Sequence, residues 1–313
     1  MSRRTLYVLT GCTASGKTDR ALRWAEANGA EIISCDSLLF YRGMDIGTAK
    51  PKAAERARVP HHLIDIIGVG EAMNVARYSR LARDAAESIA ARGRRVLVVG
   101  GSGFYLKSFL APVADEIEVS ADVRARVSAT LAEGGLPALV SELAGLNPGG
   151  LGSLDTANPR RVARALERCL ASGRTLPELA ADFARLQPAF GDWDARVVEL
   201  RREPDDLARR ATGRIEGMLR DGLVEEVRGL LARGLRENPS AARAIGYREV
   251  IAMFDGKLPA DGLASEIGKN TRALIKKQAT WFRTQLPPHR VLEVGEMADP
   301  GALFSPEGFL NPG

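Results

Sequence analysis

Short apolar runs alternate with amphipathic stretches along the first hundred residues. The predicted strands lie at 6–9, 31–34 and 96–99, and the continuous apolar runs at 6–9 and 96–99 are typical of strands that are buried in a parallel sheet. Between them, 17–28 and 78–92 carry apolar residues at helical spacing. Strands that alternate with helices predict an α/β fold with a parallel sheet flanked by helices.

The strand signal fades after about residue 115. The stretch 122–186 predicts short helices interrupted by glycine and proline. We therefore expect a small all-helical domain at 118–195, inserted into a core formed by 1–117 and 196–313. The expected elements of the second half of the core are strands at 197–200 and 291–294 and helices at 204–221, 223–233 and 264–285.

A phosphate-binding motif follows the first predicted strand. It fits G-x-x-x-x-G-K-[ST] in full and consists of Gly11, Cys12, Thr13, Ala14, Ser15, Gly16, Lys17 and Thr18. Backbone N–H groups of such a loop, together with the start of the following helix, surround phosphate oxygens, and the lysine adds a positive charge. The Thr18 hydroxyl can ligate Mg²⁺. The core is therefore predicted to be a P-loop NTPase-like fold that binds a di- or triphosphate.

Two further polar residues follow predicted strands. A motor or switch ATPase usually carries an acid after an apolar strand, but 96–99 leads into Gly100-Gly101-Ser102-Gly103. The second strand instead leads to Asp36. Because the carboxyl ends of parallel strands face the ligand crevice, we expect Asp36 and Ser102 to face the phosphate loop. Asp36 is then a general base or a group near the metal, although both residues could also serve only in turns.

Composition and charge narrow the class of protein. Apolar residues form 45% of the 313 residues and charged residues 27%, which is an ordinary globular balance. The net charge of +5 lies in 201–290, where 18 Lys and Arg face 12 Asp and Glu, so a polyanionic partner is possible. Three widely spaced cysteines form neither a disulfide framework nor a zinc pattern. No apolar run is long enough to span a membrane, and 6–9 is too short for a signal sequence, so we expect a cytoplasmic protein.

Several longer motifs together resemble bacterial tRNA dimethylallyltransferases. The most specific is Tyr41-Arg42-Gly43-Met44-Asp45-Ile46-Gly47-Thr48-Ala49-Lys50-Pro51. Others are Pro60-His61-His62-Leu63-Ile64-Asp65, Val99-Gly100-Gly101-Ser102-Gly103-Phe104-Tyr105, Asn158-Pro159-Arg160-Arg161, Ala244-Ile245-Gly246-Tyr247-Arg248-Glu249 and Lys277-Gln278-Ala279-Thr280-Trp281-Phe282-Arg283. The similarity extends from about residue 5 to residue 290.

The resemblance implies transfer of a dimethylallyl group from dimethylallyl diphosphate to N6 of the adenosine at tRNA position 37, beside the anticodon. The phosphate loop would hold the diphosphate with Mg²⁺, and Arg214 would contact it. Asp36 would contact N6 and accept its proton. Ser102 stands where the family usually has threonine, and its hydroxyl could still bind phosphate.

The resemblance also implies contacts with the tRNA anticodon stem-loop. The implied residues are Asp36, Ser37, Leu38, Leu39, Ser102, Arg124, Arg160, Arg161, Arg164, Arg243, Arg248, Lys276, Lys277, Gln278, Trp281 and Arg283. Taken alone, Gln278 is by default a solvent-facing residue and Trp281 is more often a core residue. Phe104 and Tyr105 are expected to pack, and one of the two histidines His61 and His62 is expected to be packed or hydrogen-bonded. The absence of an exposed heptad pattern favours a monomer.

Two other enzymes share part of this pattern. A small-molecule P-loop kinase would explain the phosphate loop and Asp36, but not the arginine-rich helices. An adenylate isopentenyltransferase that acts on free AMP would need no RNA-binding surface. A non-enzymatic RNA-binding protein is disfavoured, because it would have no use for Lys17 and Thr18.

Overall fold

The chain forms two compact units in a computed structural model that describes residues 3–114, 117–294 and 303–305. One unit contains 1–111 and 188–313, and the other contains 112–187. The sequence-based boundaries of the insertion, 118–195, differ from these by six to eight residues.

The larger unit contains a parallel sheet with the strand order β3-β2-β4-β1-β5-β6. The strands are β1 (Arg4–Gly11), β2 (Ala30–Ser34), β3 (His61–His62), β4 (Arg95–Val99), β5 (Trp193–Arg201) and β6 (Arg290–Glu293). In the central strand β1, Leu9 lies opposite both Val99 of β4 and Val198 of β5. The five predicted strands are present, β1 and β5 longer than expected, and β3 is an addition. The carboxyl ends of β1, β2 and β4 therefore meet at one edge.

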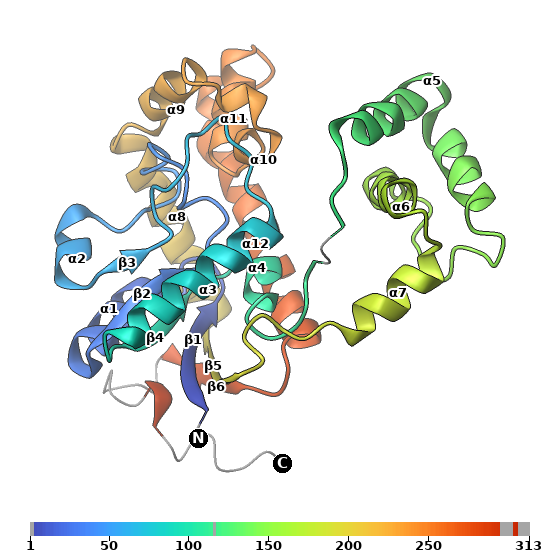
Figure 1. The fold of residues 1–313 in the computed structure, drawn as a ribbon. Coiled ribbons are helices and arrows are strands. Elements are labelled where there is room, and N and C mark those ends of the chain that lie inside the picture. The colour runs from blue at the N-terminus through green and yellow to red at the C-terminus, as the bar shows by residue number, and fades with distance from the viewer. Residues whose placement is uncertain (1–2, 115–116, 295–302, 306–313) are drawn as a thin grey trace. The chain divides into compact units, whose positions relative to one another are not determined.

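The two faces of the sheet pack against different helices. Leu6 and Val8 share a buried cluster with residues of α3 (Val75–Ala91), which crosses in front of the strands in Figure 1. Leu9 instead belongs to a cluster with the apolar face of α1 (Lys17–Asn28). Because successive side chains of a strand point to opposite faces, α1 and α3 cover opposite sides of the sheet. The helix α3 begins three residues earlier than predicted because the Asn74 side chain accepts a hydrogen bond from Arg77 N.

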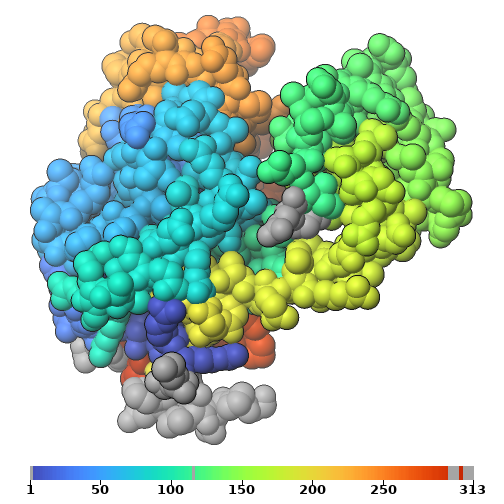
Figure 2. Space-filling model, in the orientation of Figure 1, coloured from blue at the N-terminus to red at the C-terminus, as the bar shows by residue number. Residues whose placement is uncertain are grey.

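Helices after β5 complete the larger unit. They are α8 (Pro204–Arg220), α9 (Leu223–Leu231), the 3₁₀ turn η1 (Leu235–Glu237), α10 (Pro239–Ala242), α11 (Tyr247–Phe254), the 3₁₀ turn η2 (Ala260–Gly262) and α12 (Leu263–Gln285). Two short helices, α2 (Ala53–Arg58) and α4 (Gly103–Lys107), occur earlier in the chain. In the space-filling view, α9 to α11 (orange) adjoin the segment after β3 (light blue) (Figure 2). Side chains join these two regions, for example Asn238, whose amide donates to Val69 O.

The smaller unit is all helical. It contains α5 (Ala121–Gly145), α6 (Pro159–Ser172) and α7 (Leu176–Arg185), and its buried cluster is formed by its own residues. Glycine interrupts α5 as predicted, since Gly135 adopts φ 66° and ψ −167°. Pro159 does not interrupt a helix but is the first residue of α6, where a missing N–H is harmless. None of the described helices in either unit is long and apolar enough to cross a membrane.

Candidate active site

The phosphate loop connects the end of β1 to the start of α1. Lys17 Nζ donates hydrogen bonds to the loop carbonyls of Gly11 (2.7 Å) and Cys12 (2.8 Å). Burial of this ammonium lowers the pKa of Lys17 to about 8, although Asp36 acts in the opposite direction. The Ser15 hydroxyl is buried without a hydrogen-bond partner, and Ala14 has a φ of 67°. The loop thus holds a positive charge and an unsatisfied hydroxyl at a strained turn.

Gln278 of α12 joins the phosphate loop to the turn after β4. Its Oε1 accepts a hydrogen bond from Thr13 N (2.9 Å), and its Nε2 donates one to Gly101 O (3.0 Å). The default expectation of a solvent-facing glutamine is therefore wrong. The side-chain amide is occupied by two backbone groups that lie 88 residues apart in the sequence.

Asp36 and Ser102 lie at the carboxyl edge of the sheet, as their places after β2 and β4 predict. Asp36 Oδ1 accepts a hydrogen bond from Leu38 N (3.0 Å), which forms a local turn. Ser102 Oγ accepts one from Ser37 N (3.0 Å), so its own hydroxyl proton remains available to a ligand. Burial raises the pKa of Asp36, while the Leu38 N–H and the charges of Arg214 and Lys17 counteract that rise.

Arg214 reaches the same region from α8. Its Nη2 donates to Thr48 O (3.0 Å), and burial lowers the pKa of this arginine while Asp36 raises it. An arginine remains protonated in spite of such a shift. The half-buried Asp36 carboxylate therefore interacts electrostatically with two cationic side chains, Lys17 and Arg214.

Two pockets meet at these residues. One, of about 580 Å³, is lined by the phosphate loop, including Lys17 and Thr18. The other, of about 590 Å³, carries most of the apolar lining, including Ile215, Met218 and Phe282. Both pockets are bordered by Thr13, Asp36, Thr48, Gly101, Arg214 and Gln278. A phosphate compartment and a more apolar compartment thus share one wall, and Asp36 is part of it.

The donor set at the phosphate loop suits Mg²⁺. The Thr18 hydroxyl and the carboxylates of Asp19, Asp36 and Glu55 line the first pocket, and the Ser15 hydroxyl has no partner. Within the described ranges, no group of three His, Cys, Asp or Glu side chains forms a complete metal cage. Mg²⁺ usually keeps several waters and is held by few protein oxygens together with substrate phosphates. The residues present fit that mode of binding.

The implied tRNA-contacting residues of the larger unit lie in different environments. Ser37, Leu38, Arg243, Lys277 and Trp281 border the apolar pocket, and Leu39 borders the phosphate pocket. Lys276 and Arg283 are exposed on α12. Arg248 is half-buried, and its Nε donates to Glu249 Oε1 (2.6 Å). Most of these residues thus border one pocket.

Trp281 and Phe104 also border the apolar pocket. Trp281 is half-buried against Gly103, where a Cβ would lie 2.5 Å from the indole ring. Tyr105 packs as expected, with its ring centroid 4.5 Å from that of Tyr78. The expectation for Phe104 is wrong, because 58% of this residue is exposed. An exposed ring beside a half-buried indole provides an aromatic border to the pocket.

In the smaller unit, the implied tRNA-contacting arginines are exposed. They are Arg124 on α5 and Arg160, Arg161 and Arg164 on α6. Arg161 and Arg164 lie within 4 Å of the carboxylates of Asp155 and Glu167, respectively. Such exposed ion pairs contribute little to stability, so these arginines can exchange partners at small cost.

The two adjacent histidines are hydrogen-bonded, as expected for at least one of them. His62 Nε2 lies 2.7 Å from Glu31 Oε2, and His61 Nδ1 lies 2.7 Å from Val59 O. Because they belong to the two-residue strand β3, their side chains point to opposite faces. They form no metal pair.

Several residues near the site were not predicted from the sequence. Arg210 Nε donates to Ala14 O (3.1 Å), and Arg202 approaches Ser15 O, so two arginines hold the outer carbonyls of the phosphate loop. Their signal in the sequence is the arginine-rich run from 201 to 214. Glu226 and Tyr247 bind the segment at 45–47, and no motif rule points to that contact.

Comparison with known proteins gives consistent matches. The family described as IPP transferase matches residues 39–285. A tRNA dimethylallyltransferase of Opitutus terrae is 65% identical over 299 residues, which cover 96% of each chain, and one of Rhodococcus jostii is 40% identical over 90% of each chain. The crystal structure of the full-length tRNA isopentenylpyrophosphate transferase of Bacillus halodurans has a TM-score of 0.67 and 33% identity, and covers 93% of this chain and 90% of that one. A eukaryotic dimethylallyltransferase acting on tRNA, 23% identical, shares the fold with a TM-score of 0.80.

Proposed function

The chain belongs to the IPP transferase family, and we propose from this premise how it transfers a dimethylallyl group from dimethylallyl diphosphate to N6 of the adenosine at position 37 of tRNA. The observation that carries the mechanism is the shared wall of the two pockets, which contains Asp36 and Arg214. The donor diphosphate occupies the phosphate pocket. The adenine enters through the apolar pocket, where aromatic and basic residues line the rim.

The phosphate pocket stabilises the leaving group. When the bond between the allylic carbon and the diphosphate oxygen breaks, negative charge develops on the diphosphate. Lys17, Arg214 and the N-terminal end of α1 line the pocket in which this charge appears. Mg²⁺, held by Thr18 and the phosphate oxygens, would supply further positive charge there.

Asp36 receives the proton of the nucleophile. N6 attacks the allylic carbon, the diphosphate departs, and the N6 proton passes to the Asp36 carboxylate. An exocyclic aromatic amine is a weak nucleophile, so a carboxylate that accepts its N–H hydrogen bond makes attack easier. Burial raises the pKa of Asp36, which makes its carboxylate a stronger proton acceptor than an exposed one.

The tRNA binds through its anticodon stem-loop. A loop base must turn out of its stack to reach a pocket, and such bases are commonly held by stacking and by phosphate contacts. Phe104 and Trp281 offer aromatic surface, and Arg243, Lys276, Lys277 and Arg283 offer positive charge in the same unit. We further propose that the enzyme acts in the cytoplasm, since its three cysteines are free thiols, and that it acts as a monomer, since its sequence has no exposed heptad pattern.

One assay tests the proposal against its alternatives. The protein is incubated with labelled dimethylallyl diphosphate and Mg²⁺, and with either unmodified tRNA or AMP. A parallel reaction contains ATP and no prenyl donor. Label that enters tRNA alone supports the proposal. Label in AMP points to an adenylate isopentenyltransferase, and consumption of ATP alone points to a kinase.

The Asp36→Asn variant tests the general base. Asparagine keeps the oxygen that accepts the Leu38 N–H, so the turn is retained and only the proton acceptor is lost. We expect turnover to fall about 10²- to 10⁴-fold, the usual contribution of a general base, with tRNA affinity unchanged. The matched control is Asp84→Asn, the same change at an exposed position of α3. Full turnover of Asp36→Asn would show that Asp36 is not the base.

A further inference from the structure

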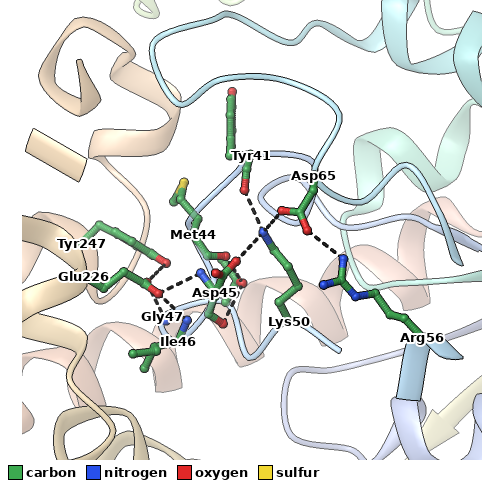
Figure 3. Close-up of polar contacts among 11 residues, drawn as sticks. Tyr41, Met44, Asp45, Ile46, Gly47, Lys50, Arg56, Asp65, Glu226 and Tyr247 are labelled. Atoms are coloured by element: carbon green, nitrogen blue, oxygen red, sulfur yellow. Dashed lines mark hydrogen bonds and ion pairs between the residues drawn. The ribbon is translucent and has the colours of Figure 1, made fainter. Parts of the chain in front are cut away.

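The segment 44–51 belongs to the most specific motif of the sequence, and its residues Gly47 and Thr48 border the apolar pocket. Its first half contacts a single carboxylate. Glu226 of α9 accepts hydrogen bonds from the backbone N–H groups of Asp45 (2.9 Å), Ile46 (2.6 Å) and Gly47 (3.2 Å) (Figure 3). Three consecutive N–H groups that point at one carboxylate fix the conformation of this segment.

Tyr247 of α11 completes the contact. Its hydroxyl donates to Glu226 Oε1 (2.6 Å), and the residue is fully buried. The backbone of Gly47 lies directly against the phenol ring, because a Cβ at this position would be 2.5 Å from Tyr247 Cε2. Any side chain at Gly47 would therefore displace either the ring or the segment.

The second half of the motif is anchored by Lys50. Its buried ammonium contacts Asp45 Oδ1 (2.7 Å), Asp65 Oδ1 (2.5 Å) and Tyr41 O (2.8 Å) (Figure 3). Asp65 is held in turn by Arg56 (2.8 Å). The segment between Asp45 and Lys50 is thus fixed at both ends.

The carbonyl of Thr48 lies between these two anchors. It accepts a hydrogen bond from Arg214 Nη2 (3.0 Å), and the Arg214 side chain makes no other hydrogen bond within the described part of the chain. Arg214 and Asp36 both line the shared wall of the two pockets, and their opposite charges interact. The direction of the Arg214 guanidinium therefore depends on where the segment holds Thr48 O.

We propose that Glu226 is a positioning residue for Arg214. It touches neither substrate, but it fixes the segment 45–48 so that Thr48 O directs the guanidinium toward the departing diphosphate. The proposal rests on the function proposed above, in which Arg214 binds that diphosphate. The predicted effect is specific to diphosphate binding and passes through Arg214.

A double-mutant cycle tests the pathway. The four proteins are the wild type, Glu226→Gln, Arg214→Ala and the double variant, and the measurement is calorimetric binding of inorganic diphosphate with Mg²⁺. Glutamine matches glutamate in size, but its NH₂ group cannot accept the hydrogen bonds that one of the carboxylate oxygens receives. We expect Glu226→Gln to weaken diphosphate binding about tenfold, a typical effect of a lost hydrogen bond to a charged group. When Glu226→Gln is introduced into the Arg214→Ala variant, we expect it to weaken diphosphate binding less than about twofold. The reason is that the effects of two substitutions are not additive when one residue acts through the other.

Equal weakening in both backgrounds, or none in either, would overturn the proposal. The control is Glu225→Gln, the same change of charge at the preceding residue, whose carboxylate is 69% exposed. The control should leave binding unchanged. Affinity for tRNA should also remain the same in Glu226→Gln, whereas a general loss of structure would lower it.

Two further measures keep the test decisive. If Glu226→Gln does not fold, Tyr247→Phe replaces it in the cycle, because phenylalanine removes one hydrogen bond to Glu226 and keeps the ring against Gly47. Its smaller effect, about threefold, must likewise disappear in Arg214→Ala. Diphosphate binding also separates this proposal from the proposed function. If the wild type transfers no dimethylallyl group to tRNA while the coupling is present, the proposed function fails and the positioning role stands.

Discussion

Replacement of Gln278 by methionine tests whether α12 controls the phosphate loop. Methionine has a similar length but neither accepts from Thr13 N nor donates effectively to Gly101 O. Each lost neutral hydrogen bond costs about 0.5–1.5 kcal/mol, so the pair contributes about 1–3 kcal/mol. Because Gln278 borders both pockets, water can reach the freed groups, and we expect a cost at the lower end of this range. A cost of about 1–1.5 kcal/mol that falls on the ligand-bound loop weakens diphosphate binding about 5- to 13-fold.

The assay is calorimetric titration of inorganic diphosphate with Mg²⁺, accompanied by thermal unfolding and by tRNA binding. Gln285→Met is the matched control, since Gln285 lies near the end of the same helix, is exposed and bonds only its neighbour Thr284 among the described contacts. Diphosphate affinity within twofold of the wild type, together with the same melting temperature as the control, would refute the coupling. If tRNA affinity falls instead while diphosphate affinity is unchanged, Gln278 contacts the tRNA, as the family resemblance implies.

Two other predictions concern charge. The pKa of Lys17 in the folded protein is lowered from 10.5 to about 8, so its ammonium loses its proton in the free enzyme as the pH rises above about 8. Because diphosphate binds better to the charged form, its affinity should then fall by up to about tenfold per pH unit. Diphosphate itself also changes its charge in this pH range, and the Lys17→Arg variant controls for that change. The diphosphate affinity of the variant should not decline above about pH 8, because an arginine keeps its proton. If affinity falls with pH in the same way in both proteins, Lys17 is not the group responsible. Replacing Lys276 and Lys277 together with alanine should weaken tRNA binding and lower the slope of log affinity against log salt by up to about 2, and an unchanged slope would show that neither lysine contacts phosphate.

The sequence predicted the elements that have strong periodicity or clear end signals. The central strands and α1 were predicted correctly because their apolar runs and glycines are local signals. The strand β3 has two residues, too few to show any alternation, and α2 buries none of its residues, so neither element has a hydrophobic pattern. The helix α11 was missed because Gly246, just before it, indicates a turn, although Gly246 N donates to Glu249 and so begins the helix.

The candidate site was predictable where chain position fixes geometry. Asp36 and Ser102 each follow a parallel strand, and the sheet alone brings such residues to one edge. The partners of Gln278, Glu226 and Arg214 were not predictable, because each bond joins segments that are far apart in the sequence. A side chain that bonds backbone atoms leaves no mark on the sequence of its partner, since every residue has the same N–H and carbonyl groups.

The separate core of 112–187 has a consequence for how this enzyme can diverge. Because the buried residues of α5, α6 and α7 come from the insertion itself, substitutions there can reshape the arginine-bearing surface without disturbing the packing around the phosphate loop. If these arginines contact tRNA, as the family resemblance implies, selection for a different set of tRNAs can act on one compact unit while the chemistry is inherited unchanged in the other.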